Sequence, residues 1–107
     1  MKGQLSIFDF MGEFANLPEE KMVEQVGMLL GIKFTPEVLP KGVWRYTPAY
    51  EYKRKGLTLT VHYMTSIKNK LFISVGWNKG TAGGGAPCDS MDEAVSYFRK
   101  ILERTER

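Results

Sequence analysis

The fold is decided by a stretch of alternating side chains, Leu57-Thr58-Leu59-Thr60-Val61-His62-Tyr63-Met64. Large apolar or aromatic residues occupy the odd-numbered positions, and polar residues occupy the even ones as far as His62. Because successive side chains of a strand point to opposite faces, this pattern predicts a strand whose odd-numbered side chains face the core. A turn at Lys68-Asn69-Lys70 and a second alternating run from Leu71 to Trp77 predict an antiparallel neighbour.

A third strand is predicted upstream, over Val43 to Lys53, and the turn Lys53-Arg54-Lys55-Gly56 connects it to the first. Pro48 indicates an edge strand or a bulge, because proline cannot donate a hydrogen bond to a neighbouring strand. Aromatic residues alternate here with polar ones, so that one side of the strand would carry Trp44, Tyr46, Tyr50 and Tyr52.

Two helices flank these strands. Leu17-Pro18-Glu19-Glu20 is typical of a helix start, and the apolar spacing that follows predicts a helix over about 18–30, ended by Gly31. Ser90-Met91-Asp92-Glu93 is a capping box that begins a second helix over about 91–104. The glycine-rich residues 78–89 lack the Gly-Lys-Ser/Thr ending of a phosphate-binding loop, so a plain strand-to-helix loop is expected there.

The expected fold is therefore α+β, in the order α-β-β-β-α, with a three-stranded antiparallel sheet and two helices packed on one face. The length of 107 residues is typical of one domain, and the sequence shows no internal repeat. We expect a single domain over 17–107, preceded by an N-terminal arm over 1–16.

Composition excludes several classes of protein. No apolar run approaches the roughly 18–20 residues of a membrane span, and the N-terminus lacks the apolar stretch of a signal peptide. A single cysteine, Cys88, excludes an internal disulfide and points to the cytoplasm. Neither Cys88 nor the single histidine, His62, has a partner in a recognisable catalytic pattern. We therefore expect no enzyme activity, catalytic residue, metal or cofactor.

Charge is concentrated in the middle of the chain. Residues 41–80 carry a net charge of +7, against −3 for residues 1–40 and −1 for residues 81–107. Cations interleaved with aromatic residues favour nucleic-acid binding, although lysines in hairpin turns also keep sheet edges soluble and unpaired. The candidate contacts to DNA or RNA are Arg45, Lys53, Arg54, Lys55, Lys68, Lys70 and Lys79.

The N-terminal arm carries the most specific motif, Gln4-Leu5-Ser6-Ile7-Phe8. It resembles the pentapeptide by which bacterial proteins bind the replication sliding clamp, with isoleucine in place of the usual leucine at position 7. By this resemblance Gln4 would occupy a polar subsite, while Leu5, Ile7 and Phe8 would dock in an apolar pocket. The alternative is that these apolar residues pack on the domain itself. Similar short bacterial proteins, often from mobile elements, open with such a segment.

The order of elements resembles the double-stranded RNA-binding domain, which reads the shape of a duplex. The chain departs from that family at the second helix, where Asp89, Asp92 and Glu93 stand in place of a run of lysines. The resemblance therefore implies the topology rather than RNA binding.

Two functions follow as expectations. The first is a non-enzymatic accessory protein of bacterial DNA metabolism, which docks on the sliding clamp through its arm and contacts nucleic acid through a basic, aromatic sheet. The second is a protein-interaction module, either an inhibitor of a host enzyme or a homodimer, with no nucleic-acid affinity. In neither is a membrane involved, and the chain would be a monomer or a homodimer.

Overall fold

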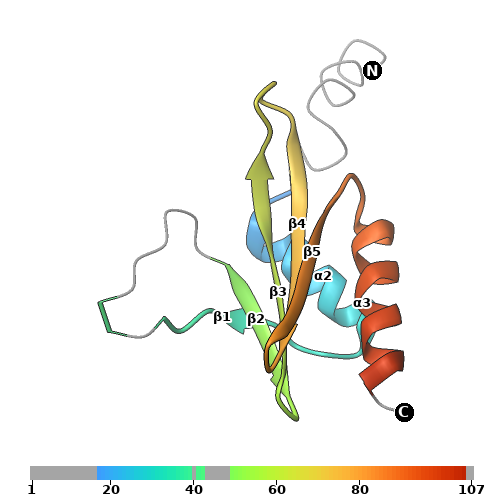
Figure 1. Cartoon of the computed structure of the whole chain (residues 1–107). Helices are drawn as coiled ribbons and strands as arrows, with labels where there is room; N and C mark the ends of the chain where they lie inside the picture. Colours follow the sequence, from blue (N-terminus) through green and yellow to red (C-terminus); the bar gives the residue numbers. More distant parts are fainter. Residues whose placement is uncertain (1–16, 40, 43–48, 106–107) are drawn as a thin grey trace.

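A computed structural model describes residues 17–39, 41–42 and 49–105. These residues form two helices and one antiparallel sheet in an α+β arrangement (Figure 1). The sheet order is β1-β2-β3-β4-β5, which is the order of the strands along the chain. The elements are α2 (Glu19–Leu30), β1 (Thr35–Pro36), β2 (Tyr50–Arg54), β3 (Leu57–Thr65), β4 (Leu71–Lys79), β5 (Ala82–Cys88) and α3 (Met91–Thr105).

The α+β class and the helix–sheet–helix order are confirmed, but the three-stranded sheet is wrong because the sheet has five strands. The larger error concerns residues 78–89, which were expected to form a loop. β4 instead continues to Lys79, a two-residue turn follows, and β5 pairs with β4 from Lys79↔Ala82 to Ile73↔Cys88.

The glycines of β5, which lower its strand propensity, are also what allows β5 to lie close against β4. A Cβ atom at Gly84 would lie 3.0 Å from the indole nitrogen of Trp77, and one at Gly85 would lie 2.9 Å from the carbonyl oxygen of Val75. Glycine lowers intrinsic strand propensity, yet it permits this close approach of side chain and backbone. The hydrogen bonds to β4 then supply the pairing that local sequence does not indicate.

The other additional strand, β1, has two residues at the edge of the sheet. Thr35 pairs with Glu51 and Pro36 with Tyr50, in a stretch that was expected to be a plain connection. An edge position tolerates Pro36, since one side of an edge strand has no partner to receive a hydrogen bond. Of the strand predicted over 43–53, residues 43–48 lie outside the described residues, and the described part begins at Tyr50.

Both helix predictions hold to within one residue. Gly31 ends α2 in the left-handed conformation with φ of 75°, and the amide of Ile32 donates to the Gly27 carbonyl at 2.9 Å. At the start of α3 the amide of Glu93 donates to the Ser90 hydroxyl at 3.1 Å. The Glu93 carboxylate accepts from the amide of Asp89 at 3.5 Å, one residue before the partner that a capping box predicts.

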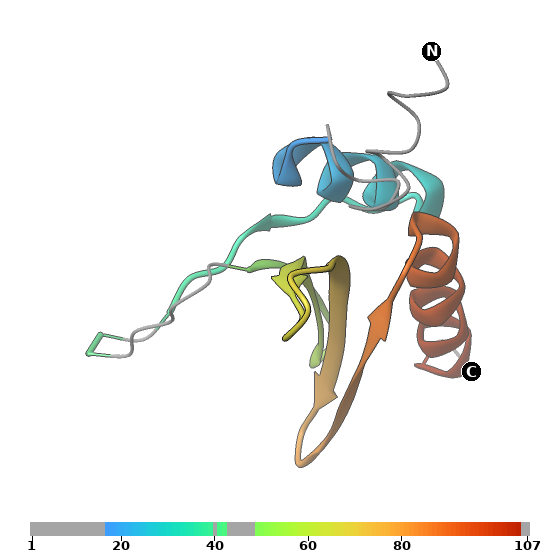
Figure 2. The same cartoon turned by 90° about the horizontal axis from the view of Figure 1, so that it is seen from above.

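The core lies between the helices and one face of the sheet (Figure 2). The odd-numbered side chains of β3 face it as predicted, with Leu57, Leu59 and Val61 buried and Tyr63 partly buried. The most deeply buried large side chains come from both helices and from the sheet: Phe98, Met22, Leu59, Ile73, Val26 and Val61.

Two hydrogen bonds fasten the start of α2 to β3 at Tyr63, two residues beyond the last pairing of β2 with β3. The Glu19 carboxylate accepts from the amide of Tyr63 at 2.8 Å, and the Tyr63 hydroxyl donates to the Leu17 carbonyl at 2.9 Å. Burial, and secondly the Glu19 charge, raises the pKa of Tyr63 to about 12. The hydroxyl therefore keeps its proton, and this hydrogen bond, at any ordinary pH. Within the described ranges, no helix has the length and apolar character needed to cross a bilayer.

Candidate nucleic-acid interface

Two hairpin turns bring cations together at one end of the sheet. The β2–β3 turn consists of Lys55 and Gly56, which have φ of 49° and 83°, and the β4–β5 turn begins at Gly80. Since the strands are antiparallel and adjacent, both turns lie at the same end, the lower one in Figure 1. Four predicted contact residues gather here, and we call this group the basic end: Lys53, Arg54, Lys55 and Lys79.

The register explains how closely these side chains approach one another. Leu57 pairs with Arg54 on one side and with Lys79 on the other, so the two cations flank a single core residue. Arg54, Lys55 and Lys79 line one small hollow against Leu102 of α3. These three cations therefore lie in or directly beside two-residue turns, next to α3.

The surroundings of the basic end modify its charge. Lys53 forms an ion pair with Glu51 at 3.6 Å, and the Glu51 side chain is only 11% exposed, so part of the Lys53 charge is neutralised. On the other side, Arg54 shares a hollow of about 250 Å³ with Arg99 and Glu103 of α3. The Arg99 guanidinium donates to the Leu29 carbonyl at 3.1 Å, and in this hollow the cation of Arg99 is accompanied by the carboxylate of Glu103.

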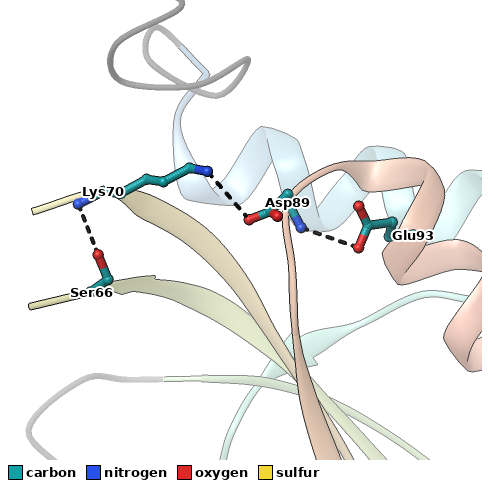
Figure 3. A network of polar contacts seen from close by, with 4 residues as sticks. All are labelled: Ser66, Lys70, Asp89 and Glu93. Atoms are coloured by element: carbon teal, nitrogen blue, oxygen red, sulfur yellow. Dashed lines mark hydrogen bonds and ion pairs between the residues drawn. The ribbon is translucent and has the colours of Figure 1, made fainter. Parts of the chain in front are cut away.

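Lys68 and Lys70 lie at the opposite end of the sheet, in the β3–β4 turn. The Lys70 ammonium is 3.8 Å from the Asp89 carboxylate, and the Lys70 amide donates to the Ser66 hydroxyl at 3.1 Å (Figure 3). From the sequence, the cations of residues 41–80 were expected to form one patch. The fold instead divides those in the described ranges between the two ends of the sheet. Arg45 lies outside the described residues.

Of the strand residues of the basic end, Lys53 lies on the face of the sheet opposite the helices, whereas Arg54 and Lys79 lie on the helix side. By strand register, the positions of the face opposite the helices hold mainly small and polar residues, and neither described helix packs on it. The row nearest the basic end joins Lys53, Thr58, Asn78 and Gly83. We call this surface the open face, although Glu51 on it is buried, and its further positions include Thr60, His62, Ser74, Gly76 and Gly85.

The aromatic residues of the described strands lie mostly on the other face. Tyr50, Tyr52, Tyr63 and Trp77 are partly buried against the core. The ring of Tyr52 meets that of Phe34 edge to face at 6.4 Å, and burial is the main cause of a raised pKa at Tyr50. These rings therefore serve packing, on the same face of the sheet as Arg54 and Lys79. Trp44 and Tyr46 lie outside the described residues.

The fold places Cys88 and His62, which could act together as a nucleophilic thiol and its base, on different faces of the sheet. Cys88 is buried on the core side of β5, whereas His62 takes an open-face position on β3. Burial, followed by the charges of Glu93 and Asp89, raises the pKa of the Cys88 thiol to about 11. The Nδ1 atom of His62 lies 3.1 Å from the Tyr63 carbonyl oxygen, which can only accept, so this nitrogen carries the proton. In the part of the chain that the structure describes, no three metal-ligating side chains lie together.

Sequence reasoning missed Asn78 and Arg99 at this interface. Asn78 falls in the expected loop, although continuing the alternation of Leu71 to Trp77 by one residue places it on the open face beside Thr58. Arg99 carries no local signal, since its place beside Arg54 depends on how α3 packs.

The predicted clamp-binding residues Gln4, Leu5, Ile7 and Phe8 lie outside the described residues. Comparison of the chain with protein-family models, characterised proteins and solved structures finds no match.

Proposed function

We propose that this chain is a non-enzymatic accessory protein of bacterial DNA metabolism that grips the backbone of a nucleic-acid duplex with its basic end. The observation that carries the proposal is the gathering of Lys53, Arg54, Lys55 and Lys79 in and beside two neighbouring turns. Nucleic-acid affinity arises largely from cations that neutralise phosphates and release counterions. A cluster of this kind supplies that attraction without any requirement for base sequence.

The spacing of the cations suits a duplex backbone. The two turns are separated by two strand spacings, or about 10 Å. Over that distance a DNA duplex presents several phosphates, because it carries one charge per roughly 1.7 Å of its axis. Arg54 can present a planar fork to a phosphate, while Lys55 and Lys79 act as point charges.

The open face supports a duplex rather than a single strand. Thr58 and Asn78 stand in one row with Lys53 and can donate hydrogen bonds to phosphate or sugar oxygens. Proteins that bind single strands instead stack bases on aromatic rings. Tyr52 and Trp77, the described aromatic residues nearest this end, lie on the same face as Arg54 and Lys79, where they are partly buried against the core.

Residues 4–8 would tether the domain to the sliding clamp, which itself encircles DNA. Two weak contacts on one assembly strengthen each other, because the second contact forms at a high effective concentration. The modest charge of the basic end is then sufficient for binding at the clamp, where the tether holds it close to the duplex.

Two matched double variants test the proposal. One removes two turn lysines from the basic end (Lys55→Gln with Lys79→Gln), and the other removes two from the opposite turn (Lys68→Gln with Lys70→Gln). We expect the first to weaken binding to a fluorescent DNA duplex about tenfold at low salt, which corresponds to about 0.7 kcal/mol per lysine. The second should change the affinity less than about twofold, by the same conversion of fold-change to energy.

Equal losses in the two variants would contradict a localised interface. No duplex binding by the wild-type chain at low salt would overturn the proposal and leave the protein-interaction module. A separate titration of the clamp with the full chain and with Leu5→Ala/Phe8→Ala tests the tether. Saturable binding that the double variant loses supports it, and equal affinities refute it.

A further inference from the structure

A groove runs along one side of α2. It has a volume of about 350 Å³ and lies between α2, the chain that leads into β1, and Tyr50 at the start of β2. Gly27, which also lines it, has no side chain, and this lets the carbonyl oxygen of Ile32 lie close beneath the helix. Its lining combines apolar and acidic side chains. We call it the α2 groove, and the lining residues that matter here are Glu20, Glu24, Met28, Phe34 and Tyr50.

The α2 groove has an apolar surface with an acidic border. Phe34 is buried, while the side chain of Met28 is 73% exposed. Glu20 and Glu24 stand one helical turn apart and outnumber the single cation in the lining, Lys33. This combination fits an apolar side chain that is flanked by positive charge.

The β3–β4 turn presents that chemistry on the same chain. Ile67 at its tip is fully exposed, and Lys68 and Lys70 follow it. The turn is ordered by hydrogen bonds from the Ser66 amide to the Lys70 carbonyl and from the Asn69 amide to the Ser66 carbonyl, both at 2.9 Å. We call Ser66 to Lys70 the hairpin tip, and Figure 1 shows it standing clear of both helices.

We propose that the hairpin tip of one copy docks in the α2 groove of a second copy, and that the exchange is reciprocal. Ile67 would pack on Phe34 and Met28, while Lys68 would face the carboxylates of Glu20 and Glu24. Two features favour a second copy of this chain as the occupant. The hairpin tip and the α2 groove are complementary in charge and in apolar character, and every copy carries both.

The placement of the two surfaces allows a closed dimer. Tyr50 in the groove pairs with Val61 of β3, and the hairpin tip begins at Ser66, five residues after Val61. At a strand rise of about 3.3 Å per residue, the groove and the hairpin tip of one copy are about 17 Å apart along β3. In a two-fold dimer each surface meets its counterpart once, so the interface closes and no filament grows. The basic end lies at the other end of the sheet, and dimerisation therefore leaves it free.

Sedimentation velocity of the full chain without nucleic acid tests the dimer, over concentrations from about 1 μM to about 1 mM, a range that spans weak association. We expect a concentration-dependent dimer that Ile67→Ser abolishes. The matched control is Leu29→Ser, which alters an apolar side chain that is 55% exposed on α2 but does not line the groove. It should leave the dimer constant unchanged, and thermal unfolding should show both variants folded.

A charge swap tests the pairing itself. Glu24→Lys and Lys68→Glu should each weaken the dimer at least tenfold, and the chain that carries both changes should recover to within about threefold of the wild-type dimer constant, as a direct ionic contact requires. A monomer at every concentration, a dimer that survives Ile67→Ser, or a double variant as weak as the single variants would each overturn the proposal. Because nucleic acid is absent, none of these outcomes depends on the duplex-binding function.

Discussion

Replacing Gly27 with alanine should destabilise the protein, although the change favours a helix. Gly27 lies in the interior of α2, where alanine is better than glycine by about 1 kcal/mol. A Cβ atom at this position would lie only 2.7 Å from the carbonyl oxygen of Ile32, well inside van der Waals contact. Overpacking of this kind costs about 1–3 kcal/mol. The shift would also strain the bond from the Ile32 amide to the Gly27 carbonyl, worth about 1 kcal/mol.

The net expectation for Gly27→Ala is a loss of about 1–2 kcal/mol in the free energy of unfolding, which lowers the melting temperature by about 4–8 °C per kcal/mol in a domain of this size. Thermal unfolding followed by circular dichroism measures it directly. Ser96→Ala serves as the control, because it raises helix propensity at an exposed position of α3 and should leave the melting temperature unchanged or slightly higher. A higher melting temperature for Gly27→Ala would refute the close approach beneath α2.

Three further experiments test the packing. Tyr63→Phe should lower the free energy of unfolding by about 1 kcal/mol through loss of the hydrogen bond to Leu17. Because the folded-state pKa of Tyr63 is about 12, against an ordinary value of about 10, this difference should be fully present below pH 10 and shrink as the pH rises towards 12. Denaturant midpoints of both chains at pH 9 and pH 11 would show it. Cys88, buried and with its thiol pKa raised to about 11, should react with a thiol reagent at pH 8 far more slowly in the folded chain than in denaturant, and equal rates would contradict its burial. Ser90→Ala removes the hydroxyl that caps the Glu93 amide and should lower the free energy of unfolding by about 1 kcal/mol in urea, so an unchanged midpoint would count against the cap.

Local patterns were sufficient for the elements whose side chains alternate or repeat. Leu57 to Tyr63 and Leu71 to Trp77 each bury one face, and that burial imposes the alternation seen in the sequence. Gly31 and Ser90 mark helix ends because each satisfies a local backbone requirement. β5 has no such signal: three consecutive glycines carry no side chains and so no periodicity, and the strand depends on its partner β4.

The candidate site was predictable as a set of residues but not as a surface. The seven cations are visible in the sequence, but their distribution depends on which turns share an end of the sheet. A prediction that ended the last strand at Trp77 did not follow the register to Lys79, which pairs with Leu57 and so stands near Arg54. The same hairpin geometry places Lys68 at the opposite end, where Asp89 offsets the charge of the neighbouring Lys70.

The salt dependence of duplex binding tests the central claim most directly. If Arg54, Lys55 and Lys79 each neutralise a phosphate, the logarithm of the affinity should fall with the logarithm of salt with a slope of about −2.7, or roughly 40-fold between 50 and 200 mM. Lys55→Gln with Lys79→Gln should reduce the slope to about −0.9, while Lys68→Gln with Lys70→Gln should leave it at the wild-type value. A slope near zero for the wild type, or the same slope for both double variants, would contradict a duplex interface at the basic end.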